Sequence, residues 1–496
     1  MKKSAQIHKA LTALAYIVML TGMTLLLAVV FRYPQNHLFP RQMIRGVGIC
    51  VIALLAAGAL WNKIYSLIGK RTPLYLLALA IFGVLLYITS LSRQGNEDTL
   101  VDYTYVYRDA MNLATGGTLE YTDYFVTYSN NLKPMLLLSV WFRVAVLLGI
   151  SSFHFVLLRN ILLVLLVVWA CGYLTEQNGD CRWRFPILLA FAFLLPLWDM
   201  VSVFYTDSMS FGLGILTLAL LKKAGSAKTN RGKTLWSVLA GVVTVLAIIW
   251  KITAIIPLIA CTMILLWQRK KADRRVILPL VVSVIVFGVG LQLWANTYDV
   301  TRKAAVTANP VMSWVALGMK EDGSWTNNTE LVEQMYTFST KEEKQQYCVE
   351  YIRENKADFF NAEHLRKKAS YNFANGNLGA SAFLNVEQND QTMIWEMFSP
   401  WGSYYWRTSQ LCYCYLVSVY VLLWIGMLSS LRNVIRGQNP PSLLMICQLG
   451  FFGIVVFLML WEASSRQLYN QMPGILLGGV LSIDYFWKNL SIKPKK

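Results

Sequence analysis

Four carboxylates stand in a short stretch that follows an apolar run. The run Leu74 to Leu91 is long enough to cross a bilayer, and Glu97, Asp98, Asp102 and Asp109 follow it. An unpaired charge that reaches lipid costs about 2 to 3 kcal/mol. Acidic residues at this place therefore call for a chemical role or for polar surroundings.

Helical spacing would place four polar residues on one face of a helix over 98–114: Asp98, Asp102, Tyr105 and Asp109. A carboxylate near other carboxylates and near lipid has a raised pKa, which brings it into the range of a general base. The alternative interpretation, a solvated polar helix at the membrane surface, fits this stretch equally well.

Isolated ionisable residues occur at the ends of several later apolar segments: Lys133, Asp199, Asp207, Lys251, Glu462 and Arg466. Cations can hold a phosphate and a carboxylate can take the proton of a hydroxyl nucleophile, so a mixed cluster suits a phosphate-bearing lipid substrate. Snorkelling or helix-end pairing explains each residue taken alone. Glu462 and Arg466, four residues apart, could simply neutralise each other.

The composition indicates a polytopic membrane protein. Hydrophobic residues make up 56% of the 496 residues and charged residues only 15%. The net charge of +18 comes from Lys and Arg that separate apolar runs, and no basic patch with interleaved aromatics favours nucleic-acid binding. We expect an all-α bundle of about twelve transmembrane helices near 11–31, 45–62, 74–92, 154–174, 186–204, 207–221, 235–250, 252–267, 276–295, 409–430, 442–461 and 470–487.

The short loops alternate in charge as the positive-inside rule requires. The basic clusters, such as 222–233, 269–275 and the tail SIKPKK, fall on one side together with both termini. This pattern predicts a cytoplasmic-membrane protein with cytoplasmic termini. Most carboxylates then lie outside, which predicts an extracytoplasmic active site.

Two long polar stretches divide the chain. The expected organisation is an N-terminal pair of spans (1–73), a core (74–295) with a catalytic outer loop (93–153), a small and mostly helical extracytoplasmic domain (296–407), and C-terminal spans with a basic tail (408–496). Within the outer loop, 134–150 is short and carries Arg143, which favours an interfacial helix.

Metal and cofactor signals are weak. The chain has only four His, and its eight Cys are scattered without metal-ligand spacing. No nucleotide-binding motif is seen. We predict no metal site and no obligatory cofactor, and leave a divalent cation open.

An ordered set of motifs resembles a known family. VDYTYVYRDAMNLATGG, NNLKPMLLL, YTDS, WKITAIIPLIA and WEASSRQLYNQMPGILL occur in an order similar to that of the integral-membrane glycosyltransferases of the GT-C superfamily. The resemblance is to the bacterial group related to protein mannosyltransferases and the lipid A aminoarabinose transferase, and it covers the chain from about residue 90 onward. The two spans before 74 look like an addition.

The resemblance implies a GT-C-like bundle and a polyprenyl-phosphate-linked sugar as donor. It gives Asp102 the role of catalytic carboxylate, Lys133 a phosphate contact, and Asp207 the acidic position that opens a later span. Leu132 replaces the family's carboxylate before Lys-Pro, so no metal or acceptor role is carried over from that position.

The residues then suggest a mechanism by direct displacement with inversion. Asp102 accepts the proton of an acceptor hydroxyl, with Asp98, Asp109 and Asp207 as supporting acids. Lys133, Lys251 and Arg466 hold the donor phosphate. The acceptor or sugar contacts are assigned to Tyr105, Asn131 and Glu462.

The partners expected are the lipid-linked sugar, membrane lipids and an envelope acceptor, which is a cell-wall polysaccharide, teichoic acid, lipid or protein. Two alternatives remain open: a flippase or transporter of a lipid-linked saccharide, and a non-catalytic partner of an envelope-polymer synthase. A transporter more naturally places polar groups near the membrane midplane, in broken helices.

Overall fold

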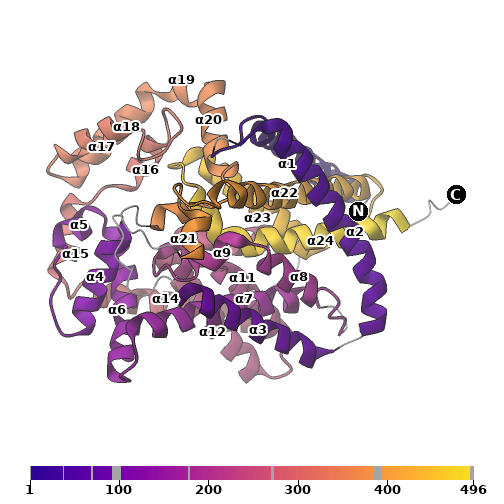
Figure 1. The fold of residues 1–496 in the computed structure, drawn as a ribbon, viewed down its shortest axis with the longest axis horizontal. Helices are drawn as coiled ribbons and strands as arrows, with labels where there is room; N and C mark the ends of the chain where they lie inside the picture. The colour runs from indigo at the N-terminus through magenta and orange to yellow at the C-terminus, as the bar shows by residue number, and fades with distance from the viewer. Residues whose placement is uncertain are drawn as a thin grey trace.

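The computed structural model describes residues 2–36, 38–68, 71–91, 102–176, 179–269, 273–384 and 392–491. Within these ranges every regular element is a helix, as Figure 1 shows. The prediction of an all-helical polytopic protein is confirmed.

Eight helices are long and apolar enough to cross a membrane. They are α1 (Lys2–Arg32), α2 (Pro40–Ile68), α3 (Thr72–Ser90), α7 (Ser152–Thr175), α12 (Asn230–Trp250), α14 (Arg274–Ala295), α22 (Tyr405–Ile435) and α23 (Ser442–Leu460). Each coincides with one of the twelve predicted spans.

The other four predicted spans are short, interrupted or less apolar helices. They form α8 (Arg184–Ala192) with α9 (Leu195–Met200), α10 (Thr206–Met209) with α11 (Leu213–Ser226), η3 (Ile252–Ile255) with α13 (Ile256–Trp267), and η5 (Ser465–Gln471) with α24 (Met472–Ser491). Pro196 begins α9, and Gly212 adopts a left-handed conformation before α11, with φ of 64°. A side chain at Gly212 would collide with Val167, so tight packing also requires glycine there.

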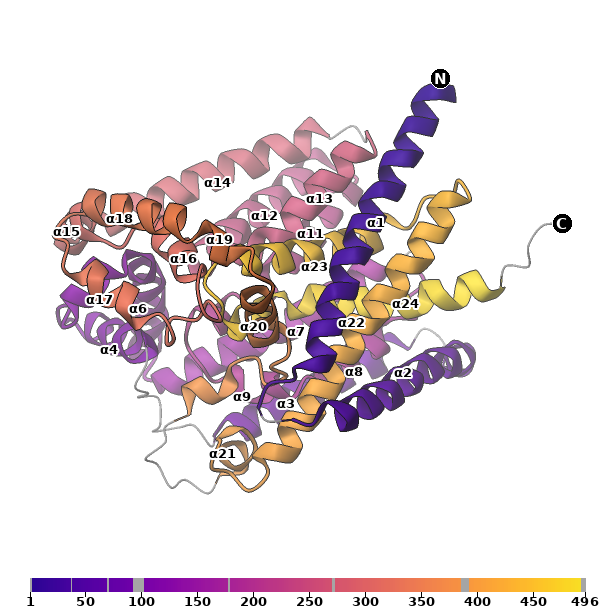
Figure 2. The ribbon, with the colours of Figure 1, turned by 90° about the horizontal axis from the view of Figure 1, so that it is seen from above.

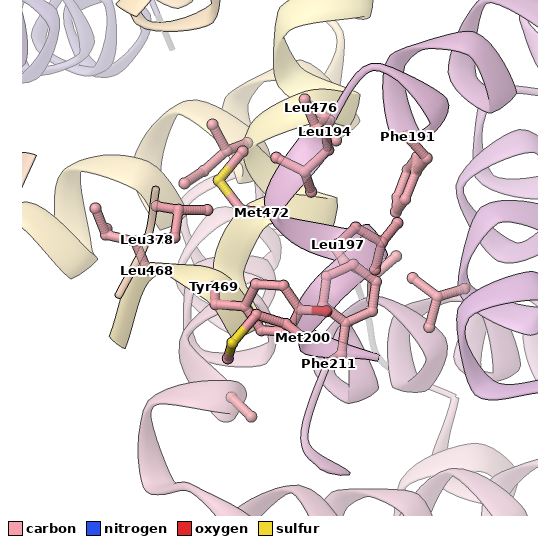
Figure 3. Packing of buried hydrophobic residues seen from close by; sticks show 14 of the residues in the cluster. Phe191, Leu194, Leu197, Met200, Phe211, Leu378, Leu468, Tyr469, Met472 and Leu476 are labelled. Atoms are coloured by element: carbon pink, nitrogen blue, oxygen red, sulfur yellow. The ribbon is translucent and has the colours of Figure 1, made fainter. Parts of the chain in front are cut away.

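The spans enclose these interrupted helices. α1 and α2 pack on α22, α22 packs on α24, and α12 lies between α11 and α14. Figure 3 shows the centre, where Phe191 and Leu197 meet Phe211 and Tyr469. The backbone groups at the breaks in these helices lack intrahelical hydrogen-bond partners. They are surrounded by protein, which can supply other partners.

The two predicted polar stretches form compact helical regions. The first contains α4 (Asp102–Ala114), α5 (Thr122–Thr127), η2 (Ser129–Asn131) and α6 (Leu132–Leu147), and α4 packs against α6. α6 coincides with the helix predicted at 134–150.

The second stretch contains α15 (Asp299–Thr307), α16 (Val311–Leu317), α17 (Thr329–Tyr336), α18 (Lys341–Glu354), α19 (Lys356–Phe359), α20 (Ala362–Phe373), η4 (Ala380–Phe383) and α21 (Met393–Phe398). A small apolar cluster joins α16, α17 and α18. Thr340 and Glu343 form a reciprocal cap that fixes the start of α18. The region also contacts the transmembrane part, because α20 packs on α1.

Most helices of the two polar regions lie at one side of the molecule. In Figure 2, α4 and α15–α18 lie opposite the start of α1 and the end of α24. The assignment of either side to cytoplasm or exterior stays a prediction.

Candidate functional site

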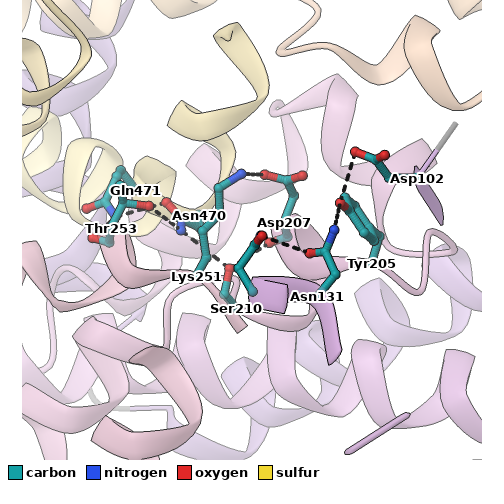
Figure 4. Close-up of polar contacts among 10 residues, drawn as sticks. Asp102, Asn131, Tyr205, Asp207, Ser210, Lys251, Thr253, Asn470 and Gln471 are labelled. Carbon is teal, nitrogen blue, oxygen red and sulfur yellow. Dashed lines mark hydrogen bonds and ion pairs between the residues drawn. The ribbon is translucent and has the colours of Figure 1, made fainter. Parts of the chain in front are cut away.

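The first turn of α4 carries Asp102, which lies beside a chain of hydrogen-bonded polar groups. The hydroxyl of Tyr205 donates to Oδ2 of Asp102 over 3.4 Å, and Nδ2 of Asn131 donates to that hydroxyl over 3.3 Å. Asn131 also donates to Tyr124 over 2.6 Å. Figure 4 shows Asp102, Tyr205 and Asn131 in this order. Asp102 remains half-buried, so its carboxylate can still meet a ligand.

Asp207 and Lys251 form a buried ion pair next to this chain. Asp207 opens α10 and its side chain is 0% exposed, while Lys251 follows the last residue of α12 and is 16% exposed. One carboxylate oxygen of Asp207 receives the ammonium group. The other, Oδ2, is buried and has no hydrogen-bond partner in the described part of the chain. A buried charged oxygen without a donor favours an additional ligand or water at this point.

A polar belt holds the interrupted helices around this pair. Asn470 donates to Ser210 over 3.4 Å and to Thr253 over 3.0 Å, and Gln471 donates to the carbonyl of Thr253 over 2.6 Å. Lys251 itself has extended backbone, with φ of −163°. The belt thus supplies hydrogen bonds where α12 stops and η3 begins, next to Lys251.

Glu462 and Arg466 lie beyond the end of α23, on the loop that leads into α24. The Arg466 guanidinium lies 5.9 Å from the ring centre of Tyr205 and 5.7 Å from that of Phe383. Glu462 and Arg466 are both half-buried, and neither forms an ion pair or hydrogen bond with a described residue. The expected pairing of the two with each other is therefore not formed within the described ranges.

Charge in this cluster depends on burial. Burial raises the pKa of Glu462 to about 7, while Arg466 and Lys251 counteract the rise. Burial alone would lower the pKa of Arg466, but Asp207, Asp102 and Glu462 raise it, so the guanidinium stays charged. Arg466 is consequently a permanent cation that forms no ion pair with a carboxylate in the described ranges.

Helix α20, in the second polar stretch, contacts the loop 461–464 that carries Glu462. Lys368 of α20 is 0% exposed and donates to the carbonyl of Gly318 over 2.6 Å. Burial lowers the pKa of Lys368 to about 7, against the opposing effect of Glu462. Asn372 accepts from the backbone N–H of Ser464 over 2.8 Å. α20 therefore holds the 461–464 loop through Asn372.

Two other predicted site residues lie at or beyond the edge of this cluster. Lys133 begins α6, burial lowers its pKa, and no ion pair joins it to the cluster within the described ranges. Tyr105 stacks on Tyr124, with ring centres 4.5 Å apart, and so borders the chain that ends at Asp102. Asp98 lies outside the described residues.

Asp109 has a structural contact that accounts for its burial. It is 0% exposed and accepts the backbone N–H of Glu120 over 2.8 Å and that of Tyr121 over 3.0 Å. Burial raises its pKa, and these two donors oppose the rise. Asp109 closes the turn after α4.

Sequence reasoning missed Tyr205 and Lys368. In FYTDS, Tyr205 is two residues before Asp207, and alternation in extended backbone could have associated the two. Lys368 gave no signal, since KKAS reads as an exposed basic stretch. Only the packing of α20 on the 461–464 loop reveals it.

Metal ligation finds no support in the described ranges. No group of three or more His, Cys, Asp or Glu side chains there is placed to hold a metal ion. The site is thus described by its carboxylates, cations, tyrosine and amides.

Comparison with known proteins gives one match. The model of a family described as "conserved hypothetical integral membrane protein" matches residues 5–487. The chain belongs to this family. No curated protein and no solved structure matches it. The match covers the N-terminal spans as well as the cluster.

Proposed function

We propose that this membrane protein is a glycosyltransferase of the GT-C type, which moves a sugar from a polyprenyl-phosphate donor to an envelope acceptor on the outer face of the cytoplasmic membrane. The observation that carries the proposal is the position of Arg466, which pairs with no described carboxylate, beside both Asp102 and the Asp207–Lys251 pair. A phosphate needs such a cation, and a hydroxyl nucleophile needs such a carboxylate.

The depth of the cluster agrees with a lipid-linked substrate. Lys251 follows the 21-residue span α12, and Glu462 follows the 19-residue span α23. Both groups thus lie where a full span ends, at one membrane face, rather than halfway across. A donor with its chain in lipid presents its phosphate at this level.

The proposed reaction is a single displacement. Asp102 accepts the proton from the acceptor hydroxyl as the hydroxyl oxygen bonds to the anomeric carbon of the sugar. The bond from that carbon to the phosphate oxygen breaks, and both of its electrons leave with the lipid phosphate. Arg466 and Lys251 stabilise the departing anion. Attack opposite to the leaving group gives an inverted product.

The test uses purified full-length protein in lipid nanodiscs, a radiolabelled polyprenyl-phosphate sugar and envelope fractions as acceptors. We expect labelled acceptor with wild-type protein and its loss with Asp102→Asn. Asp299→Asn serves as a matched control, because Asp299 is an exposed carboxylate paired only with Arg302. Wild-type protein that moves the labelled lipid between leaflets without transfer would establish a flippase and overturn the proposal.

A further inference from the structure

A cavity of about 470 Å³ lies between the end of α1 and the face of α20 that points away from the cluster. This volume is in the range of small-molecule sites, roughly 300 to 1,000 Å³. Its wall combines a segment of the N-terminal pair of spans with the outer helical region. Neither part alone encloses it.

The wall is held in place by its own hydrogen bonds. Gln35 donates to Ser370 over 2.6 Å, and Ser370 donates to the carbonyl of Tyr33 over 2.6 Å. The guanidinium of Arg366 lies 4.1 Å from the ring centre of Tyr33. The cavity is therefore preformed, which lowers the entropy that a ligand must lose on binding.

The chemistry of the wall fits a polyhydroxylated ligand. Tyr33 keeps 39% of its surface exposed although Arg366 lies over its ring. Asn327 donates to Asp322 over 2.7 Å, which fixes an amide and a carboxylate side by side. Rings, amides and carboxylates together provide a stacking surface with both donors and acceptors. Of the three cations in the wall, Arg366 and Lys367 are paired with Glu363 and Glu321, and Arg32 shares the wall with the carboxylates of Glu321 and Asp322, so the wall carries both signs of charge.

α20 connects this cavity with the charged cluster. Ser370 and Tyr371 face the cavity, while Asn372 of the same helix accepts from Ser464 in the loop of Glu462 and Lys368 donates to Gly318. The hydroxyl of Tyr371 lies within electrostatic reach of Glu462 and Arg466. One short helix thus separates a polar cavity from the candidate active site.

We propose that this cavity binds a saccharide unit of the acceptor at a distance from the unit that is modified, because a helix about 10 to 12 Å across, α20, lies between the cavity and the cluster. This inference rests on the proposed function and deepens it, since it makes the acceptor a glycan rather than a simple lipid or a bare peptide. The N-terminal spans then contribute to acceptor choice through Tyr33 and Gln35.

Direct binding tests the cavity without any activity. Saturation-transfer NMR on the full chain in nanodiscs is measured with cellobiose and with N,N′-diacetylchitobiose, for wild type, Tyr33→Leu and Asn327→Ala. We expect a signal with at least one disaccharide in wild type and a loss of roughly five- to tenfold in affinity when the ring is removed. Phe360→Leu is the control, because Phe360 is 75% exposed and lies outside the cavity wall. No signal in wild type, or undiminished signals in both variants, would overturn the inference.

A transfer assay separates this inference from the proposed function. If the cavity variants raise the acceptor KM and Phe360→Leu does not, the cavity is an acceptor subsite. Transfer that depends on Asp102 but keeps its acceptor KM in both cavity variants would remove the cavity proposal alone. Disaccharide binding without any transfer in wild type would remove the proposed function alone.

Discussion

Two carboxylates of α4, Asp102 and Asp109, have opposite settings. Asp102 accepts one long hydrogen bond from Tyr205, at 3.4 Å, and remains half-buried beside Arg466. Asp109, two turns later, is fully buried and accepts two backbone N–H groups at 2.8 and 3.0 Å. One carboxylate is available to a ligand, and the other is used by the fold. Tertiary neighbours, rather than position on the helix, separate the two roles.

Asp102→Asn tests the carboxylate of α4 that is available to a ligand. The amide keeps the size of the side chain but cannot accept a proton from a hydroxyl, so transfer should fall by roughly 10² to 10⁴. The thermal midpoint of the purified protein should stay close to wild type, because only one long hydrogen bond is altered. Transfer within twofold of wild type would show that Asp102 is not the base.

Asp207 presents a third setting, in which the carboxylate is paired with a cation. Lys251→Met leaves a buried charge without its partner, and removing one partner of such a pair costs about 3 to 5 kcal/mol. The double variant Asp207→Asn with Lys251→Met should recover most of this stability, measured by denaturation in mixed micelles. Transfer should remain low in both variants, since the cation that faces the phosphate is lost. A double variant as unstable as the single one would contradict the pairing.

Asp109→Asn tests the carboxylate of α4 that holds the turn after the helix. The amide can offer only one oxygen to the two backbone donors, so one partly buried N–H loses its acceptor at a cost of about 1 kcal/mol. We expect a lower thermal midpoint with wild-type transfer per folded molecule. A large loss of transfer at unchanged stability would instead return Asp109 to the group of supporting acids.

Much of the fold could be predicted from hydropathy, but the interrupted helices could not. Eight spans follow from apolar length alone. The segments 186–204 and 207–221 are just as apolar, yet Pro196 and Gly212 divide them, and a hydropathy average does not register a single turn. The breaks matter, because Asp207 lies between α9 and α11. Lys251 lies at a further break, between α12 and η3.

The candidate site was predictable by residue type and only partly by geometry. Isolated charges beside apolar runs identified Asp207, Lys251, Glu462 and Arg466, since such groups are costly near lipid. The sequence could not reveal that Lys251 pairs with Asp207 while Arg466 pairs with no described carboxylate. Those partners come from helices far apart in the chain.

Glu462 should make donor binding depend on pH. Its pKa of about 7 means that it is neutral below pH 7 and charged above it, so raising the pH adds a negative charge near the phosphate site. Lys368, also with a pKa of about 7, loses its positive charge in the same direction. The donor KM should thus rise roughly fivefold from pH 6 to pH 8, as expected for one charge in a high dielectric. Glu462→Gln should flatten the rise, and an identical profile in this variant would exclude Glu462 as the titrating group.

Tyr205→Phe tests the contrast between Asp102 and Asp109 with the smallest change. The substitution keeps the ring beneath Arg466, at 5.9 Å, and removes only the hydroxyl that donates to Asp102. Because that bond is long, its loss should cost little, and transfer should fall by roughly two- to threefold. Transfer at the wild-type rate would show that the hydroxyl does not act on Asp102. A loss above tenfold would show that Tyr205 does more than donate one long hydrogen bond, so the contrast between Asp102 and Asp109 would then depend on the tyrosine as well.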